Sequence, residues 1–217
     1  MKKEHPRRDC VTAGAAGKGE HSKFTAPSPA FQPPSANNAN GDQTAADATR
    51  LNSALDFALR YARLGFHVFP LHSMLDGRCT CAGECGRNAA KHPRVRGGFK
   101  AATTDARQIE TWWRKWPDAN VAIATGSISG IVVIDIDGTQ GLSTLQEIVN
   151  KHGPLPRTAM VRTARGWHLY FRMPPGIAIS CSAGDGLDVR GDGGYAVAPP
   201  SVHAAGHVYQ WGSDAVA

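Results

Sequence analysis

The sequence lacks long hydrophobic runs. No apolar stretch reaches the roughly 18 residues that a membrane-spanning helix needs. The charged start of the chain is not followed by an apolar stretch of signal-peptide length either, because Gly17, Lys18 and Glu20 interrupt it. These two absences argue against a membrane protein and against export, so we expect a cytoplasmic protein.

Cysteine and acidic residues are also scarce. The chain of 217 residues has 5 cysteines, and an odd number without a secretory signal favours free thiols or metal ligation over a disulfide framework. Lysine and arginine number 24 against 18 acidic residues, which gives a net charge of +6. A basic chain favours a polyanionic partner such as a nucleotide or nucleic acid, although many unrelated proteins are equally basic.

The first part of the chain lacks core-forming residues. Residues 1–48 consist largely of Ala, Gly, Pro, Ser and Asn, and Phe24 and Phe31 are their only aromatic residues. Burial of so few apolar groups does not offset the entropy lost on ordering. We therefore predict a disordered tail over 1–48, followed by one folded domain over 49–217.

Apolar spacing within 49–217 predicts three helices and several strands. The helices are expected over 51–65, from an N-cap at Thr104 to Pro117, and from a capping box that begins at Ser143 to Gly153. Helices interspersed with strands indicate an α+β or α/β domain with a mixed sheet. The predicted strands are 66–71, 121–124, 131–137, 161–163, 167–171, 187–190 and 195–198.

The strongest local signal is an apolar strand, 131–137, that contains two carboxylates near its end, Asp135 and Asp137. Side chains alternate along a strand, so both acids point to the same face and repel each other unless a cation lies between them. Such hard oxygen ligands suit Mg²⁺ or Mn²⁺. The alternative is a strand-end turn in which both residues accept hydrogen bonds from loop amides.

Two further strands each carry polar residues two positions apart. His168 shares a face with Tyr170, and Asp188 shares a face with Arg190. If these faces coincide with that of Asp135 and Asp137, three carboxylates lie beside a histidine and an arginine. Nucleotidyl transfer uses carboxylates that bind two metal ions. His168, with Arg190 or Arg165, would then neutralise the charge of the triphosphate.

A second cluster lies in a polar loop over 79–92. Four donors within a short loop match the tetrahedral ligand set of a structural Zn²⁺, and the alternative is a set of unligated, reduced thiols. The donors are Cys79, Cys81, Cys85 and His92. Basic residues around this loop favour contact with a template strand, or form a solvated surface. They are Arg78, Arg87, Lys91, Arg94 and Arg96.

Several short segments occur in a recognisable order. They are GFHVFP (65–70), KHP (91–93), NVAIATG (120–126), SGIVVIDID (129–137), TARGWHLYF (163–171), GLDVRG (186–191) and GGYAVAPPS (193–201). Together they resemble the bifunctional DNA primase/polymerase domain of the archaeo-eukaryotic primase superfamily, found in plasmids, phages and other mobile elements. The resemblance spans about 55–211.

This resemblance implies an RNA-recognition-like catalytic core with a small α/β module, and an active site in the cleft between them. It assigns the metal-binding acids to Asp135, Asp137 and Asp188, and phosphate binding to His168. The family commonly has small residues where this chain has Arg165, and many members carry a zinc-binding element. The implied reaction joins NTPs or dNTPs on single-stranded DNA with Mg²⁺ or Mn²⁺, in replication of a mobile element, with a helicase in cis or in trans.

Two other functions are compatible with parts of the sequence. The segment 131–139 also resembles the nucleophile motif of haloacid-dehalogenase-type phosphatases, in which Asp135 would be phosphorylated and Asp137 would be the general acid and base. Such phosphatases need a later lysine and a further acidic pair, for which 191–193 is a poor match. The other alternative is a non-catalytic, zinc-containing module that binds nucleic acid for a partner protein.

Overall fold

The structure is a computed structural model that describes residues 53–212. Its helices are α2 (Ala54–Arg63), α3 (Ala106–Lys115) and α4 (Gly138–His152). The tail predicted over 1–48 lies outside the described residues. No helix within 53–212 has both the length and the apolar character to cross a bilayer. All ladders between the named strands are antiparallel, and this confirms an α+β domain.

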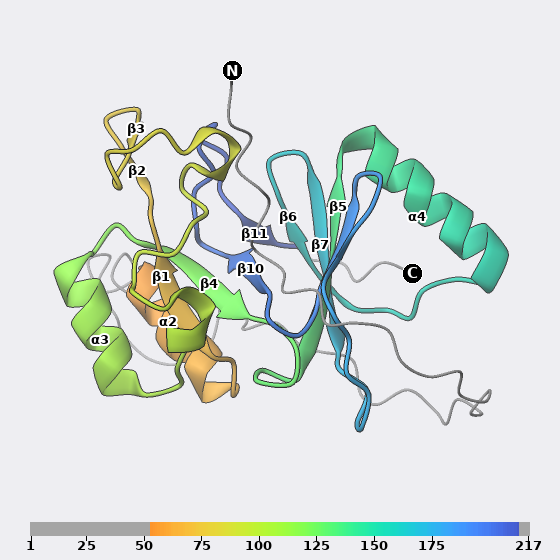
Figure 1. Ribbon diagram of the computed structural model, residues 1–217, viewed down its shortest axis with the longest axis horizontal. Coiled ribbons are helices and arrows are strands. Elements are labelled where there is room, and N and C mark those ends of the chain that lie inside the picture. Colours follow the sequence, from red (N-terminus) through yellow and green to blue (C-terminus); the bar gives the residue numbers. More distant parts are fainter. Residues whose placement is uncertain (1–52, 213–217) are drawn as a thin grey trace, which may run out of the picture.

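A small sheet forms one side of the molecule. Its central strand is β4 (Asn120–Ala124), with β1 (Val68–Leu71) and β10 (Tyr195–Ala198) on either side. Every residue of β4 is buried, as expected for a strand covered on both faces. Helices α2 and α3 pack against each other and against this sheet (Figure 1). The small α/β module expected from the resemblance is therefore present, and its third strand comes from near the end of the domain.

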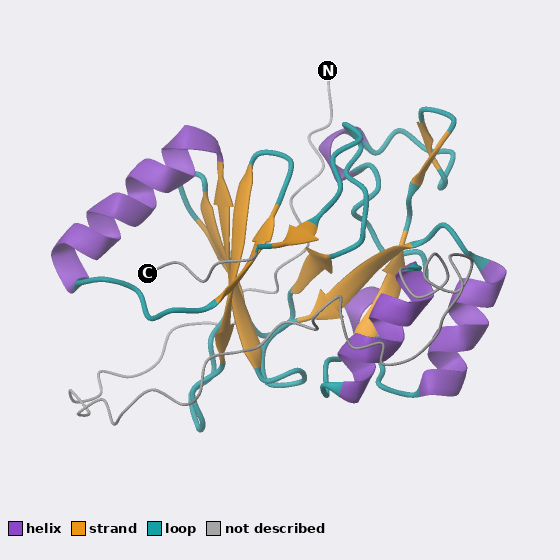
Figure 2. Ribbon diagram, turned by 180° about the vertical axis from the view of Figure 1, so that it is seen from behind, coloured by secondary structure: helices purple, strands orange, loops and turns teal. Residues whose placement is uncertain are grey.

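A larger sheet of six strands forms the other side. Helix α4 connects β5 to β6 and packs against β5 and β9, on the outer face of the sheet (Figure 2). Four strands have the order β6-β7-β5-β9, which corresponds to the expected RNA-recognition-like core with a loop in place of its second helix. The strands, in sheet order, are β11 (Gln210–Trp211), β6 (Ala159–Arg162), β7 (Gly166–Arg172), β5 (Ile131–Asp137), β9 (Leu187–Arg190) and β8 (Ser182–Ala183).

One hydrophobic core joins the two sheets. It contains Ile123 of β4 and also Val133 and Tyr170 of the larger sheet. Tyr61 of α2 ties the parts together by polar contacts, because its hydroxyl donates to the Pro199 carbonyl (2.8 Å) and accepts from the indole N–H of Trp211 (2.9 Å). The two sheets are thus held as one packed body.

The cysteine-bearing loop leaves β1 and returns to it. It contains the short hairpin of β2 (Met74–Leu75) and β3 (Arg78–Cys79), followed by 3₁₀ turns at Gly86–Asn88 and Gly98–Ala101. A bridge between Leu71 and Pro93 ties its return to the end of β1. The loop therefore lies at the end of the small sheet.

Two predicted helix starts are wrong. The N-cap of α3 is Asp105, whose side chain accepts from the Arg107 amide at 3.0 Å, and not Thr104. Helix α4 begins at Gly138, directly after β5, and Ser143 lies exposed inside it. The first turn of α4 contains glycine and has poor helix propensity, so the sequence pattern predicted a start that is later than the observed one. The predicted end at Gly153 is confirmed.

Helix α4 begins where its backbone approaches the loop before β9. A Cβ atom at Gly141 would collide with the backbone oxygen of Gly186. Thr144 strengthens the contact by donating to the Asp185 carbonyl at 2.8 Å. Gly141 thus allows α4 to pack closely beside the strand that carries Asp188.

Replacing Gly141 by alanine should destabilise the protein, although alanine normally stabilises a helix interior by about 1 kcal/mol over glycine. We expect Gly141→Ala to lower the free energy of unfolding by about 1–3 kcal/mol, because the new methyl group meets the Gly186 backbone. Urea denaturation followed by circular dichroism measures this. Ser143→Ala in the same helix is the control and should change stability by less than about 0.5 kcal/mol. A Gly141→Ala protein as stable as the wild type would contradict the close approach.

Candidate active site in the cleft between the sheets

The strand register of the larger sheet gathers the predicted residues on one face. Strand β5 lies between β7 and β9, and Asp135 is directly opposite His168 on one side and Asp188 on the other. Directly opposite residues of antiparallel strands point to the same face. Asp137 and Arg190 lie two positions along their strands and share this face. The three polar faces therefore coincide, which is the condition that the sequence analysis set for a cluster of three carboxylates.

Arg190 separates the two carboxylates that lie closest across the strands. Its Nη2 atom is 2.8 Å from Asp188 Oδ2 and 3.5 Å from Asp135 Oδ2. Like charges directly opposite each other destabilise a sheet. The guanidinium contacts both acids and offsets this repulsion.

His168 contacts Asp135 from the other side. Its Nε2 atom is 3.4 Å from Asp135 Oδ1, while its buried Nδ1 atom has no hydrogen-bond partner among the described residues. Burial opposes ionisation of Asp135, but the hydrogen bond and charge of His168, with the charges of Arg190 and Lys91, outweigh it and lower its pKa from 3.8 to about 2. Asp135 is therefore an anion throughout the neutral range.

Asp137 occupies the end of β5 and has a different partner. Arg165, from the turn between β6 and β7, forms an ion pair with its carboxylate. Both side chains are substantially exposed, so this pair contributes little to stability. Arg165 nevertheless lies at the cleft with the acids, as the sequence analysis expected.

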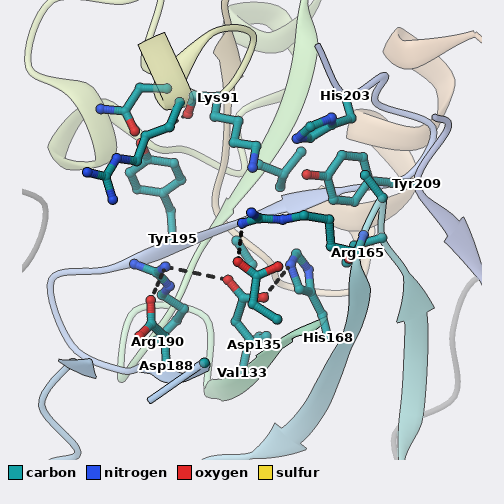
Figure 3. Close-up of a pocket in the computed structure, with 18 of the residues that line it drawn as sticks. Lys91, Val133, Asp135, Arg165, His168, Asp188, Arg190, Tyr195, His203 and Tyr209 are labelled. Carbon is teal, nitrogen blue, oxygen red and sulfur yellow. Dashed lines mark hydrogen bonds and ion pairs between the residues drawn. The ribbon is translucent and has the colours of Figure 1, made fainter. Parts of the chain in front are cut away.

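A cleft of about 340 Å³ lies over this face. Its floor is the larger sheet, and its opposite wall is formed by the cysteine-bearing loop, strand β10 and the segment after it. Lys91, Tyr195 and His203 lie on that side, whereas Tyr209 lies beside His168, with 5.8 Å between the ring centroids (Figure 3). Sequence analysis gave Tyr195, His203 and Tyr209 no role, because nothing local shows which strand returns to face the acids.

The four predicted zinc ligands converge. Their donor atoms all lie within 4.8 Å of one another, with Cys79 Sγ 3.4 Å from His92 Nε2 and Cys81 Sγ 3.0 Å from Cys85 Sγ. Three thiols and one imidazole are a donor set that suits Zn²⁺. Burial resists ionisation of Cys79, yet hydrogen bonds from the Cys81 and Ala90 backbone and from His92 lower its pKa to about 6. A thiolate is the form that ligates a metal.

The basic residues around this loop do not form one surface. Arg94 lies over the ring of Trp116, 5.2 Å from its centroid, and Arg87 and Lys91 line the cleft. Arg78 is exposed on the β2–β3 hairpin. Arg96 is also exposed, so the five side chains divide between the cleft, the core edge and the solvent.

Asp135 should contribute to stability in a pH-dependent way. A carboxyl group whose pKa is lowered in the folded state stabilises it above the unfolded pKa, and this contribution is lost as the pH falls through the folded pKa. Between about pH 5 and pH 2, wild type should lose about 2 kcal/mol more free energy of unfolding than Asp135→Asn, because its pKa moves from 3.8 to about 2. Urea titrations at stepped pH measure the difference. Parallel curves for the two proteins would contradict the assigned ion pairs.

Comparison with known proteins identifies the family. Residues 58–217 match the family model described as bifunctional DNA primase/polymerase, N-terminal. The search of curated proteins finds no match. The matched region covers almost the whole described structure, including both sheets and the cleft. The chain therefore belongs to the bifunctional DNA primase/polymerase family, whose domain is a primase/polymerase nucleotidyltransferase.

Proposed function

We propose that this chain joins NTPs or dNTPs on a single-stranded DNA template by two-metal catalysis. Asp135, Asp137 and Asp188 are the ligands of two Mg²⁺ or Mn²⁺ ions. The observation that carries the proposal is that three carboxylates from neighbouring strands converge on one face of a cleft, beside His168 and Arg190. Bound metal ions would activate the attacking hydroxyl group and stabilise the leaving pyrophosphate.

The basic residues of the floor bind the triphosphate. Arg190 and Arg165 form ion pairs with the carboxylates. Divalent cations held by these carboxylates would take the place of the two guanidinium groups, which would then donate to phosphate oxygens. His168, whose Nε2 atom faces Asp135, adds a third donor.

The proposed catalytic unit is the single domain over 49–217. Its cleft needs both sheets, since the floor comes from the larger sheet and the opposite wall from the smaller sheet and its loop. We propose that it serves the replication of a plasmid, phage or other mobile element and works with a helicase in cis or in trans. The family supports DNA and nucleotides as substrates.

Loss of one metal-binding acid should stop synthesis without unfolding the protein. We expect Asp135→Asn to lower template-directed incorporation of labelled NTPs or dNTPs by at least about a hundredfold, because the metal supplies several kcal/mol of transition-state stabilisation. Asp76→Asn, in the exposed turn of the β2–β3 hairpin, is the control and should keep wild-type activity. Equal synthesis by Asp135→Asn and wild type would refute the assignment.

The same assay separates the two alternative functions. A non-catalytic binding module predicts template affinity that survives loss of all three acids, with no polymer product from the wild type. A phosphatase of the haloacid-dehalogenase type predicts an acid-stable phosphoryl group on Asp135. In the structure Asp135 lies between His168 and Asp188 within an antiparallel sheet, an arrangement that favours metal binding by neighbouring carboxylates.

We also propose that Cys79, Cys81, Cys85 and His92 bind one structural zinc ion. Elemental analysis of the purified protein should give about one zinc per chain, and Cys85→Ser should lose it because a tetrahedral site needs four ligands. Cys181→Ser is the matched control, since Cys181 lies outside this donor set. Protein without zinc, in which Cys79 is freely alkylated, would contradict this proposal.

A further inference from the structure

Lys91 differs from the other cations of the cleft. Arg165 and Arg190 form ion pairs with the catalytic-site acids. Lys91 lines the same cleft, is half-buried, and forms no side-chain hydrogen bond or ion pair with any residue in 53–212. Its side chain extends into the cleft from the wall opposite Asp135 (Figure 3). Burial of an ammonium group is costly. Burial lowers the pKa of Lys91, and the nearby charges of Asp135 and Asp137 oppose this only in part, so an anion that enters the cleft would stabilise the ammonium group.

The backbone around Lys91 is held at three successive carbonyl groups. The side-chain amide of Asn120 donates to the Ala90 carbonyl at 2.9 Å, and the Tyr195 hydroxyl donates to the Lys91 carbonyl at 3.0 Å. The His72 amide donates to the His92 carbonyl at 2.9 Å. Asn120 belongs to β4 and Tyr195 to β10, so the small sheet fixes this segment. Lys91 is therefore presented to the cleft from a rigid support.

We propose that Lys91 binds a phosphate group of the incoming nucleoside triphosphate from the wall opposite the metal-binding acids. The inference rests on the proposed function and adds a residue that comes from the cysteine-bearing loop. The floor then holds the triphosphate through metal ions and guanidinium groups, and Lys91 contacts it from the other side. The nucleotide is bound between the module of the larger sheet and the module of the small sheet.

The position of Lys91 favours the triphosphate over the DNA backbone as its ligand. Lys91 shares the cleft with Asp135, Asp137 and Asp188, which hold the metal ions that a triphosphate accompanies. A DNA strand follows an extended surface, and the basic residues outside the cleft, such as Arg78, are better placed for one. A lysine ammonium is also a compact charge that suits a phosphate oxygen.

Direct binding tests this assignment independently of synthesis. A fluorescent dNTP is titrated, with Mg²⁺, into wild type, Lys91→Met, Lys91→Gln, Lys91→Arg and Lys151→Met. Loss of a hydrogen bond to a charged group should raise the Kd for the nucleotide by about tenfold or more in Lys91→Met and Lys91→Gln. Lys91→Arg should recover most of the affinity. Lys151→Met, which removes an exposed charge at the end of α4, should bind as wild type does.

Further readouts separate this proposal from a structural role and from DNA binding. The two neutral variants should unfold at or above the temperature of wild type, because they remove a charge whose burial is costly. Their affinity for single-stranded DNA should change less than about twofold. If Lys91→Met does not fold, the nucleotide affinities of Lys91→Gln and Lys91→Arg are compared with that of wild type. Nucleotide affinity equal to wild type in the neutral variants would overturn the proposal, as would a loss of DNA affinity in place of nucleotide affinity. Absence of synthesis by wild type, with intact dependence of nucleotide binding on Lys91, would refute only the proposed polymerisation.

Discussion

The site depends on the position of β5 between β7 and β9. This pairing sets Asp135 directly across from His168 and Asp188. A shift of one residue in either ladder would turn the neighbouring polar residues to the face covered by α4, because side chains alternate along a strand. Hydrophobic residues of the same strands, such as Ile136 and Leu187, hold the register by requiring burial on the other face.

The second constraint is that neither sheet makes the cleft alone. The chain leaves the small sheet after β4, builds most of the larger sheet, and returns with β10 to pair with β4. This return brings Tyr195 and the segment that carries His203 and Tyr209 over the acids. One continuous core beneath the cleft keeps its floor and wall in a fixed relation.

The charged side chains on the floor of the cleft pair with one another. The acids and arginines of the floor hold one another, and this lowers the cost of keeping three carboxylates close together. In the proposed function, divalent cations would replace the arginines as partners of the acids, and the triphosphate would replace the acids as partner of the arginines. Lys91 comes from the other wall and forms no ion pair with a residue in 53–212, although the charges of Asp135 and Asp137 act on it across the cleft. The phosphate group proposed as its ligand would give it a direct partner.

Local sequence patterns determined the chemistry of this protein, and the tertiary structure decided its geometry. Period-two alternation placed Asp135 with Asp137 and Asp188 with Arg190, and short spacing brought together the four donors of the proposed zinc site, because these relations need only a few neighbouring residues. The start of α4 was misjudged, since packing at Gly141 outweighs the helix propensity of its first turn. The strand order and the residues facing the acids, Lys91 among them, could not be predicted from alternation. They depend on contacts between segments far apart in the chain, and local periodicity carries no information on which segments meet.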